Sequence, residues 1–314
     1  MKYFGISVAG NFINLGNPFS LQINMDAETP ADSLTAIFPF YSDLPEIKEI
    51  ELRNDDGTAF WAGIVDEQKI SCDINGTLIK FSARSKAAYL LDNEAMPQVY
   101  SVASLGTIFE RHIKTYGFSD FYGDTKSFSK EFYVTKGMSE WDVLEKFCAV
   151  FLNTVPRVIA GDVIDASNEP SKAAPILFSN YGDGQQYFSI SKSIKRCKLI
   201  SEVLVRADEN ASYDLIVRGA SAAQRGVRRK RYINAMNDSR TPASRAEELI
   251  SYAKKESEVL VLKCPNALPI KIGQRAAVKD KVLGKLENLI VSQIRFCVNE
   301  NGHTSEITMC REEV

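Results

Sequence analysis

The stretch from residue 60 to residue 93, FWAGIVDEQKISCDINGTLIKFSARSKAAYLLDN, decides the fold of the first part of the chain. Two strand-like runs flank Asn75-Gly76, and both central residues of a type I′ hairpin turn need the positive φ that Asn and Gly tolerate. The segment therefore predicts two antiparallel strands joined by a tight turn. Residues 86–91 then change period, and we expect a short helix there that closes the first domain.

The residues before this hairpin also read as β structure. Leu21, Ile23 and Met25 alternate with polar neighbours, as the residues of a half-buried strand do. Further strands of similar length follow, separated by turn signals. The spacing predicts a small barrel or sandwich, and we assign residues 1–92 to a first β-barrel.

Residues 93–168 combine helical periodicity with short strands. Ser139 is expected to cap a helix, with Asp142 completing a capping box. An earlier helix is expected to end at Gly117, and its apolar face comprises Leu105, Ile108, Phe109, His112, Ile113 and Tyr116. This stretch therefore predicts an α+β middle module.

Strand-like alternation resumes in residues 169–314, which we assign to a second β-barrel region. Thr241 and Pro242 place an N-cap and an N1 proline ahead of one amphipathic helix in this region. The predicted fold class is mainly β with an α/β insertion. It consists of two small tandem β-barrels and a helical, α+β middle module.

Composition excludes several classes of protein. Of the 314 residues, 45% are hydrophobic and 25% are charged, which is typical of globular domains. The formal net charge of −2 disfavours general DNA binding. We find no signal peptide in residues 1–10 and no run near the roughly 20 apolar residues of a membrane-spanning helix. We expect a protein made in a cytoplasm, without membrane insertion.

Few residues suggest catalysis. Of the two histidines, His112 lies on the apolar face of its helix and is interpreted as a satisfied core or edge residue, whereas His303 is expected to be exposed. Asp55-Asp56 has the composition of an ordinary turn. We identify no metal-ligand spacing, no phosphate-binding loop and no cofactor site. The six scattered cysteines are interpreted as reduced, mostly buried thiols. We therefore expect no enzyme.

One basic cluster stands out, comprising Arg225, Arg228, Arg229, Lys230 and Arg231. It is a candidate interface for an acidic partner surface. The alternatives are a solvated approach to the following helix and, less favoured by the near-neutral total charge, a nucleic-acid contact.

The order of these features resembles the baseplate central hub family of contractile phage tails and tail-derived bacteriocins, which includes the late-control tail proteins. Three passages carry the resemblance: the hairpin and helix at 60–93, the middle stretch at 104–162 containing SLGTIFERHIKTYGF and FYVTKGMSEWDVLEKFCAVF, and the C-terminal set that begins at RRKRY.

The resemblance implies a structural homotrimer in the baseplate of a virion or tail particle, assembled in the bacterial host cytoplasm. Each subunit would give two similar barrels to a ring, so that three copies match a hexameric tail tube on one side and a trimeric spike on the other. Other baseplate proteins would surround the ring, and tape-measure protein or DNA would pass through its channel. The family has no catalytic motif to carry over.

A rival interpretation concerns residues 132–144, which look like the opening of a LysM peptidoglycan-binding module. The sequence after Phe151 departs from that pattern. The simpler interpretation is a turn at Gly137, a cap at Ser139 and Trp141 in the core. A carbohydrate-active enzyme on a β scaffold is the third alternative.

Overall fold

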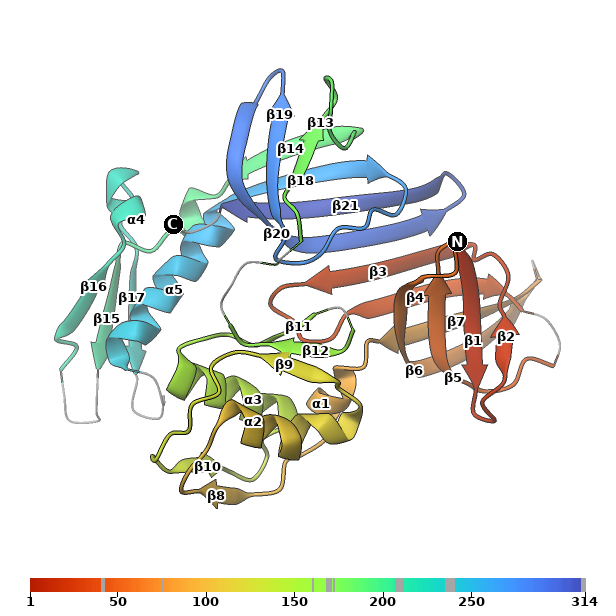
Figure 1. Cartoon of the computed structure of the whole chain (residues 1–314). Coiled ribbons are helices and arrows are strands. Elements are labelled where there is room, and N and C mark those ends of the chain that lie inside the picture. The colour runs from red at the N-terminus through yellow and green to blue at the C-terminus, as the bar shows by residue number, and fades with distance from the viewer. Residues whose placement is uncertain are drawn as a thin grey trace.

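The chain folds around one long β-sheet that bends into two barrel-like units, with two α/β units beside it (Figure 1). This mainly β architecture with a few helices confirms the predicted fold class. The computed structural model describes residues 1–40, 43–74, 76–159, 161–167, 171, 173–206, 212–234 and 241–311.

The first β unit follows the strand order β2-β1-β5-β6-β7-β4-β3. Alternation predicts its strands correctly: in β3, Leu21 and Ile23 are buried within the unit's core. Its strands are β1 (Lys2–Ser7), β2 (Phe12–Asn14), β3 (Ser20–Asp26), β4 (Ser33–Pro39), β5 (Ile47–Arg53), β6 (Ala59–Asp73) and β7 (Gly76–Arg84).

The predicted hairpin is formed by β6 and β7. Their pairing extends to Asp73 opposite Gly76, which has a φ of 130°, while Asn75 lies outside the described residues. At Gly63 a side chain is excluded, because a Cβ there would lie 2.4 Å from the carbonyl oxygen of Arg84. The hairpin is therefore both the longest pairing of the first unit and a point of close backbone approach.

The second β unit follows the order β14-β18-β21-β20-β19-β13. It joins the first unit through antiparallel pairing of β20 with β3, from Gln293 opposite Asp26 to Val298 opposite Leu21. Its strands are β13 (Ile176–Ser179), β14 (Ser189–Ile194), β18 (Glu258–Pro265), β19 (Arg275–Asp280), β20 (Gly284–Asn299) and β21 (Gly302–Arg311).

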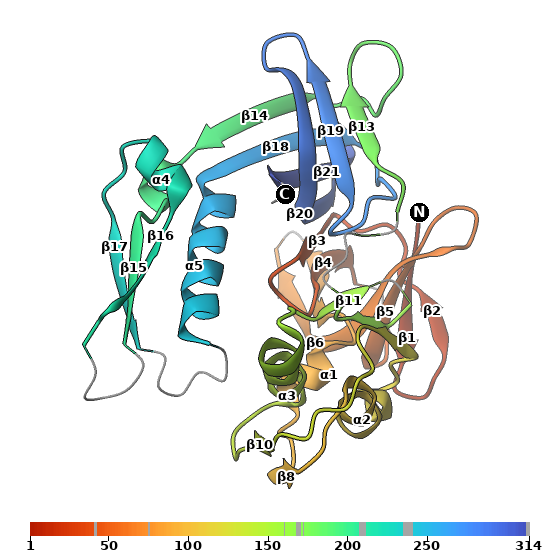
Figure 2. The same cartoon turned by 60° about the vertical axis from the view of Figure 1, so that its left-hand side comes forward.

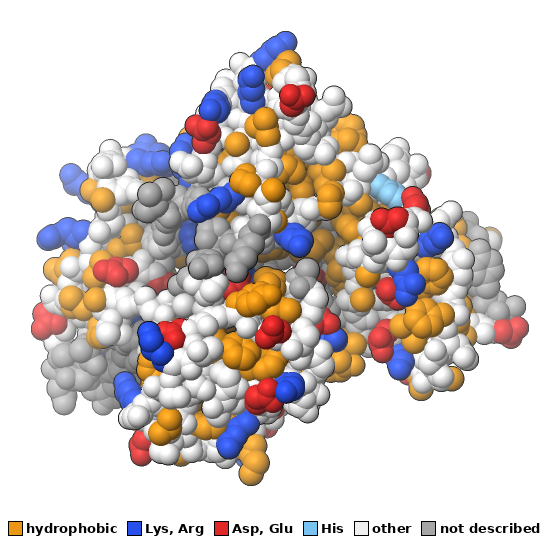
Figure 3. Space-filling view, in the orientation of Figure 1, with side chains coloured by type: hydrophobic (Ala, Val, Ile, Leu, Met, Phe, Trp, Pro, Cys, Tyr) orange, Lys and Arg blue, Asp and Glu red, His pale blue; other side chains and the backbone are white. Residues whose placement is uncertain are grey.

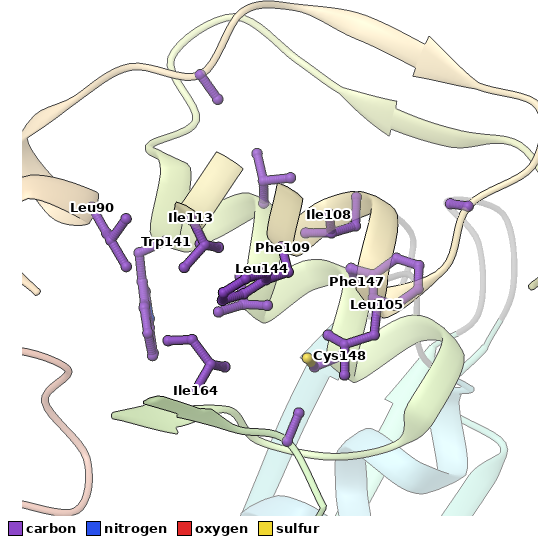
Figure 4. Packing of buried hydrophobic residues seen from close by; sticks show 14 of the residues in the cluster. Leu90, Leu105, Ile108, Phe109, Ile113, Trp141, Leu144, Phe147, Cys148 and Ile164 are labelled. Carbon is purple, nitrogen blue, oxygen red and sulfur yellow. The ribbon is translucent and has the colours of Figure 1, made fainter. Parts of the chain in front are cut away.

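The middle module packs helices over short strands (Figure 4). The predicted capping box is present, since Ser139 Oγ accepts from the Asp142 N–H and the Asp142 carboxylate accepts from the Ser139 N–H. Gly117 ends the earlier helix with a φ of 83°. The elements are α1 (Ala88–Asp92), β8 (Gln98–Tyr100), α2 (Leu105–Ile108), β9 (Asp120–Tyr122), β10 (Phe132–Val134), α3 (Glu140–Phe147), β11 (Arg157–Ile159) and β12 (Val163–Asp165).

The helical winding changes at the C-terminal ends of α2 and α3. A π-helical turn, Phe109–Ile113, and a 3₁₀ turn, Lys114–Tyr116, continue α2, and a π-helical turn, Cys148–Leu152, continues α3. The 3.6-residue period detected the buried face of each helix but not these changes in winding.

A second α/β unit interrupts the second β unit between β14 and β18 (Figure 2). The sequence-based division treats 169–314 as one region, whereas the structure gives this part its own sheet and core. Thr241 Oγ1 caps α5 as predicted, accepting from the Ser244 N–H. The elements of this small unit are β15 (Glu202–Arg206), β16 (Leu215–Arg218), α4 (Ala220–Gln224), β17 (Lys230–Asn234) and α5 (Pro242–Ser257).

Candidate interaction surfaces

The predicted basic cluster lies on the small unit, in the segment from the end of α4 into β17. Two of its members bind carboxylates: Arg225 Nη2 lies 3.3 Å from Glu258 Oε2, and Lys230 Nζ lies 2.8 Å from Glu202 Oε2. The cluster is thus partly structural.

The other three members bind no carboxylate among the described residues. Arg229 donates to the carbonyl oxygen of Cys197, and Arg231 donates to that of Lys230 at 3.3 Å. No hydrogen bond or ion pair joins Arg228 to another described residue. These guanidinium charges are therefore not neutralised within the part of the chain that the structure describes.

The fold adds a second basic run, residues 195–198, to the cluster. Arg196 donates to the carbonyl oxygen of Arg225 at 2.6 Å, which holds this run beside the end of α4. Figure 3 shows Lys and Arg side chains gathered over this part of the molecule. We call the combined surface the basic crest, and it comprises Lys195, Arg196, Lys198, Arg225, Arg228 and Arg229. Sequence reasoning missed the first three, although the run KRCK carries the same signal.

A charge cluster ties the small unit to the second β unit. Glu258, at the start of β18, contacts Lys192 at 2.9 Å, Arg311 at 3.3 Å and Arg225 at 3.3 Å. Burial alone would raise the pKa of Glu258, but the hydrogen bond from Lys192 and the neighbouring cations lower it below its ordinary value. This carboxylate is therefore stabilised in its charged form.

A second charge cluster, with one cation between two carboxylates, ties the middle module to the first β unit. Arg84, at the end of β7, donates to both oxygens of Asp66 at 2.7 and 2.8 Å and to both oxygens of Asp92 at 3.0 and 2.7 Å. These hydrogen bonds raise the pKa of Arg84 and lower that of Asp92. One cation here bridges β6 and α1.

Strands β1 and β2 lie on the opposite side of the molecule from α4 (Figure 1). Exposed apolar side chains here stand among charges of both signs, since the Arg53 guanidinium lies 5.7 Å from the centroid of the Phe12 ring and Lys48 lies 3.6 Å from Glu49. Val8 and Phe12 are 60% and 59% exposed. The Val8 N–H donates to the Glu46 carbonyl oxygen, and Ile6 pairs with both Phe12 and Glu49 across the sheet. We call this surface the β1–β2 face, and it comprises Val8, Phe12, Glu46, Lys48, Glu49 and Arg53.

The interpretation of His112 as a satisfied core residue is confirmed. Its Nδ1 lies 2.6 Å from Glu140 Oε2 and its Nε2 lies 2.8 Å from the hydroxyl of Tyr100, while Tyr116 donates to Glu140 Oε1 at 3.3 Å. His112 is 2% exposed. This chain of hydrogen bonds joins the two helices of the middle module and satisfies both ring nitrogens.

The prediction that His303 is exposed was wrong. The ring is half-buried against Phe296, with centroids 5.8 Å apart, and burial lowers the pKa of His303. Cys72 also differs from expectation, because it is exposed on the part of β6 that projects beyond the barrel core. The alternating pattern continued past the end of the buried core.

A cleft of about 1510 Å³ separates the middle module from the two β units. Phe60 and Phe296 line one wall, and Phe121 lines the other. Asp32 lies in this cleft, and burial raises its pKa to about 7. Its backbone is tied to the module's first segment, since its N–H donates to Ser85 Oγ and its carbonyl oxygen accepts from the Ser85 N–H.

Trp141 lies in the core of the middle module, as the simpler interpretation of residues 132–144 expected (Figure 4). Its side chain is 6% exposed and packs with Leu90 and Ile164 in the same cluster. With this exposure, the indole leaves little ring surface on which a sugar could stack.

Within the described ranges, no group of three or more His, Cys, Asp or Glu side chains is arranged to hold a metal ion. No described helix is both long enough and apolar enough to cross a membrane.

Neither a protein-family model nor a curated protein sequence matches this chain. Its fold is, however, similar to that of solved phage tail proteins. The 43 kDa tail protein of prophage MuSo2 from Shewanella oneidensis superimposes with a TM-score of 0.79 at 15% identity, covering 99% of this chain and 98% of that one. The tail protein of Neisseria meningitidis MC58 gives 0.73 at 15% identity, covering 99% and 97%.

A more distant similarity extends to secretion machinery. The E. coli c3393 protein, a component of the type VI secretion system with structural similarity to the T4 tail proteins gp27 and gp5, gives a TM-score of 0.59 at 7% identity. It covers 95% of this chain and 74% of that one. At these identities the similarity establishes the fold.

Proposed function

We propose that this protein is the central hub of a phage-type tail baseplate, a non-enzymatic homotrimeric ring that joins a hexameric tail tube to a trimeric spike. The observation that carries the proposal is the pair of β units joined at the β3–β20 pairing, each with an α/β unit attached. Three copies of such a chain would present six similar β units, so a ring of threefold symmetry could contact a sixfold tube.

The fold match supports this proposal because it spans nearly the whole chain. Each of the two tail proteins matches 99% of this chain, so the similarity includes both β units and both α/β units. Tail tube, spike and other baseplate proteins would be the partners, with tape-measure protein or DNA as passing cargo. The hub would assemble in the host cytoplasm and function in the virion or tail particle.

The deciding experiment measures the mass of the purified chain in solution, alone and with a candidate spike protein. We expect three times the mass of the 35.0 kDa chain, or a 3:3 complex with the spike. Single-particle images of that species should show a ring with a central channel. A chain that stays monomeric at micromolar concentration, with and without the spike, would contradict the proposal.

A further inference from the structure

The small unit holds most of the arginines of the chain. Residues 195–257 make up about a fifth of the sequence but contain nine of its 16 arginines. They contain 14 Lys and Arg against 8 Asp and Glu, a net charge of +6 that the total charge of −2 conceals. A guanidinium group can hydrogen-bond two oxygens of one phosphate at once, which an ammonium group does less well. This composition therefore suits a ligand that carries phosphate groups.

The basic crest lies at the end of the sheet where β15 and β17 begin. The Ser201 N–H donates to the carbonyl oxygen of Arg229 at 2.8 Å, which holds the start of β15 beside the start of β17. Two crest residues are paired with Glu256 and Glu258. The other four bind no carboxylate among the described residues, and they are Lys195, Arg196, Arg228 and Arg229. The crest therefore keeps positive charge for a ligand.

An apolar row crosses the open face of the sheet, on the side away from α5 (Figure 2). Val203 and Val205 are buried in the core with α5, so Leu204 between them faces the open side. Ile216 and Tyr232 are the direct neighbours of Leu204 on β16 and β17. Tyr232 is 61% exposed. The row therefore offers an aromatic ring on which a flat group of a ligand can stack.

Charged side chains stand between this row and the crest. Glu202, at the start of β15, lies 3.9 Å from Arg218 and 2.8 Å from Lys230. One carboxylate thus faces two cations, and both cations are more exposed to solvent than Glu202 is. Positive charge therefore continues from the crest onto the open face.

A second tyrosine and an arginine lie on the other side of the row. The Tyr213 ring packs edge-on against the Tyr232 ring, with centroids 5.2 Å apart, and the Arg206 guanidinium lies 5.5 Å from the Tyr213 centroid. Asp214 adds an exposed carboxylate next to Tyr213. Aromatic rings thus stand between cations on both sides, which is the arrangement of surfaces that bind single strands.

We propose that the open face of the small unit and the basic crest bind single-stranded nucleic acid. The arginines would bind phosphates, and bases would stack on Tyr232 and lie over the apolar row. A duplex keeps its base faces inside its own stack, and a purely acidic peptide offers no flat ring. The open aromatic ring beside the arginines therefore favours a single strand. This activity lies beyond the proposed hub function and does not depend on a ring.

Fluorescence anisotropy of the full chain with a labelled oligothymidylate of about 16 nucleotides tests the proposal. Lys195→Gln with Arg228→Gln should weaken binding about tenfold and lower the slope of log affinity against log salt by about 1.4, because each phosphate contact on a single strand contributes about 0.7. Tyr232→Ala should weaken binding at least fivefold without changing that slope, whereas Tyr232→Phe, which keeps the ring, should bind like the wild type.

Matched variants control for total charge and for loss of an exposed ring. Lys69→Gln with Lys80→Gln removes two exposed cations that face each other on β6 and β7. Tyr133→Ala removes an exposed ring from β10. Both controls should bind the oligonucleotide like the wild type. Thermal unfolding should show that every variant folds.

Several results would overturn the proposal. A wild-type chain that does not bind the oligonucleotide in about 50 mM salt would do so, as would a Tyr232→Ala variant that binds normally or controls that lose as much as their counterparts. A duplex that binds as tightly would indicate contact through charge alone. A polyglutamate peptide that competes equally well would indicate an acidic protein partner instead. A monomeric chain that binds the strand would contradict the hub and leave this inference standing.

Discussion

The middle module and the small unit are both α/β units attached to a β unit, but they are stabilised differently. Among the described residues, nineteen buried hydrophobic residues form the core of the middle module, against five in the small unit. The middle module is tied to its β unit by one cation between two carboxylates, and the small unit by one carboxylate among three cations. The first therefore has a large core of its own, whereas the second has a smaller described core and exposed positive charges.

The difference shows which parts of the chain carry stability and which present a surface. In the middle module, charged and polar groups such as His112 and Glu140 are turned inward and hydrogen-bonded to each other. In the small unit, α5 covers one face of the three-stranded sheet and no described element covers the other, where Ile216 and Tyr232 are 43% and 61% exposed (Figure 2).

The largest effect should come from the core of the middle module. Phe147 is fully buried and contacts Phe128, Phe132 and Phe151 through its ring. We expect Phe147→Ala to lower the free energy of unfolding by about 3–5 kcal/mol, because it removes a large apolar side chain and leaves a cavity. Denaturant unfolding measures this loss. The comparison predicts a smaller loss for Val205→Ala in the small unit, and an equal or larger loss there would contradict it.

The buried hydrogen-bond chain should give the next largest effect. Glu140→Ala leaves His112 Nδ1 and the Tyr116 hydroxyl without their partner in the core, and we expect a loss of about 2–3 kcal/mol in unfolding free energy. Glu110→Ala is the matched control, because Glu110 forms only an exposed pair with Lys114, worth about 0.5 kcal/mol or less. Equal losses for the two variants would show that these buried hydrogen bonds add nothing to the stability of the middle module.

At the junction of the small unit, Glu258→Gln should cost on the order of 1–2 kcal/mol at pH 7, because three cations lose their shared anion. The pKa of Glu258 is lowered in the folded chain, so its contribution is present above the ordinary Glu pKa of about 4.3 and is lost as the pH falls through the folded value. The difference between variant and wild type should therefore shrink below about pH 4.

Unfolding of the small unit can be followed separately by hydrogen exchange of the amides in β15 and β17. The control is Glu306→Gln, whose carboxylate contacts Lys263 and Arg295 at 3.4 Å on the same β unit but away from the small unit. Faster exchange in β15 and β17 for both variants alike would show that Glu258 has no special role at the junction.

A pH-dependent effect concerns Asp32, where the first β unit meets the middle module. Its raised pKa of about 7 means that the folded chain binds this proton more tightly than the unfolded chain does. The wild type should therefore lose stability as the pH rises from about 4 to about 7, by about 3 kcal/mol. Asp32→Asn should remove this dependence and be the more stable chain at pH 8. Parallel pH profiles for the two chains would contradict the prediction.

Local patterns in the sequence determined much of the fold. The alternation of Leu21, Ile23 and Met25 predicted β3, Ser139 with Asp142 predicted the start of α3, and Thr241 with Pro242 predicted the start of α5. The 3.6-residue period also placed His112 in the core. Each of these signals depends on residues a few positions apart, so a short stretch of sequence is enough to recognise it.

Only the tertiary structure decided the features that join distant segments. The β3–β20 pairing links residues about 270 positions apart, the small unit depends on the parallel pairing of β15 with β17, and the basic crest forms because Arg196 meets the end of α4. No local period encodes such contacts. Bringing segments together across a long loop costs entropy, and only the packing of the whole molecule offsets that cost. The sequence by itself determined the elements and their buried faces, and the tertiary structure decided which charges gather on which end of the molecule.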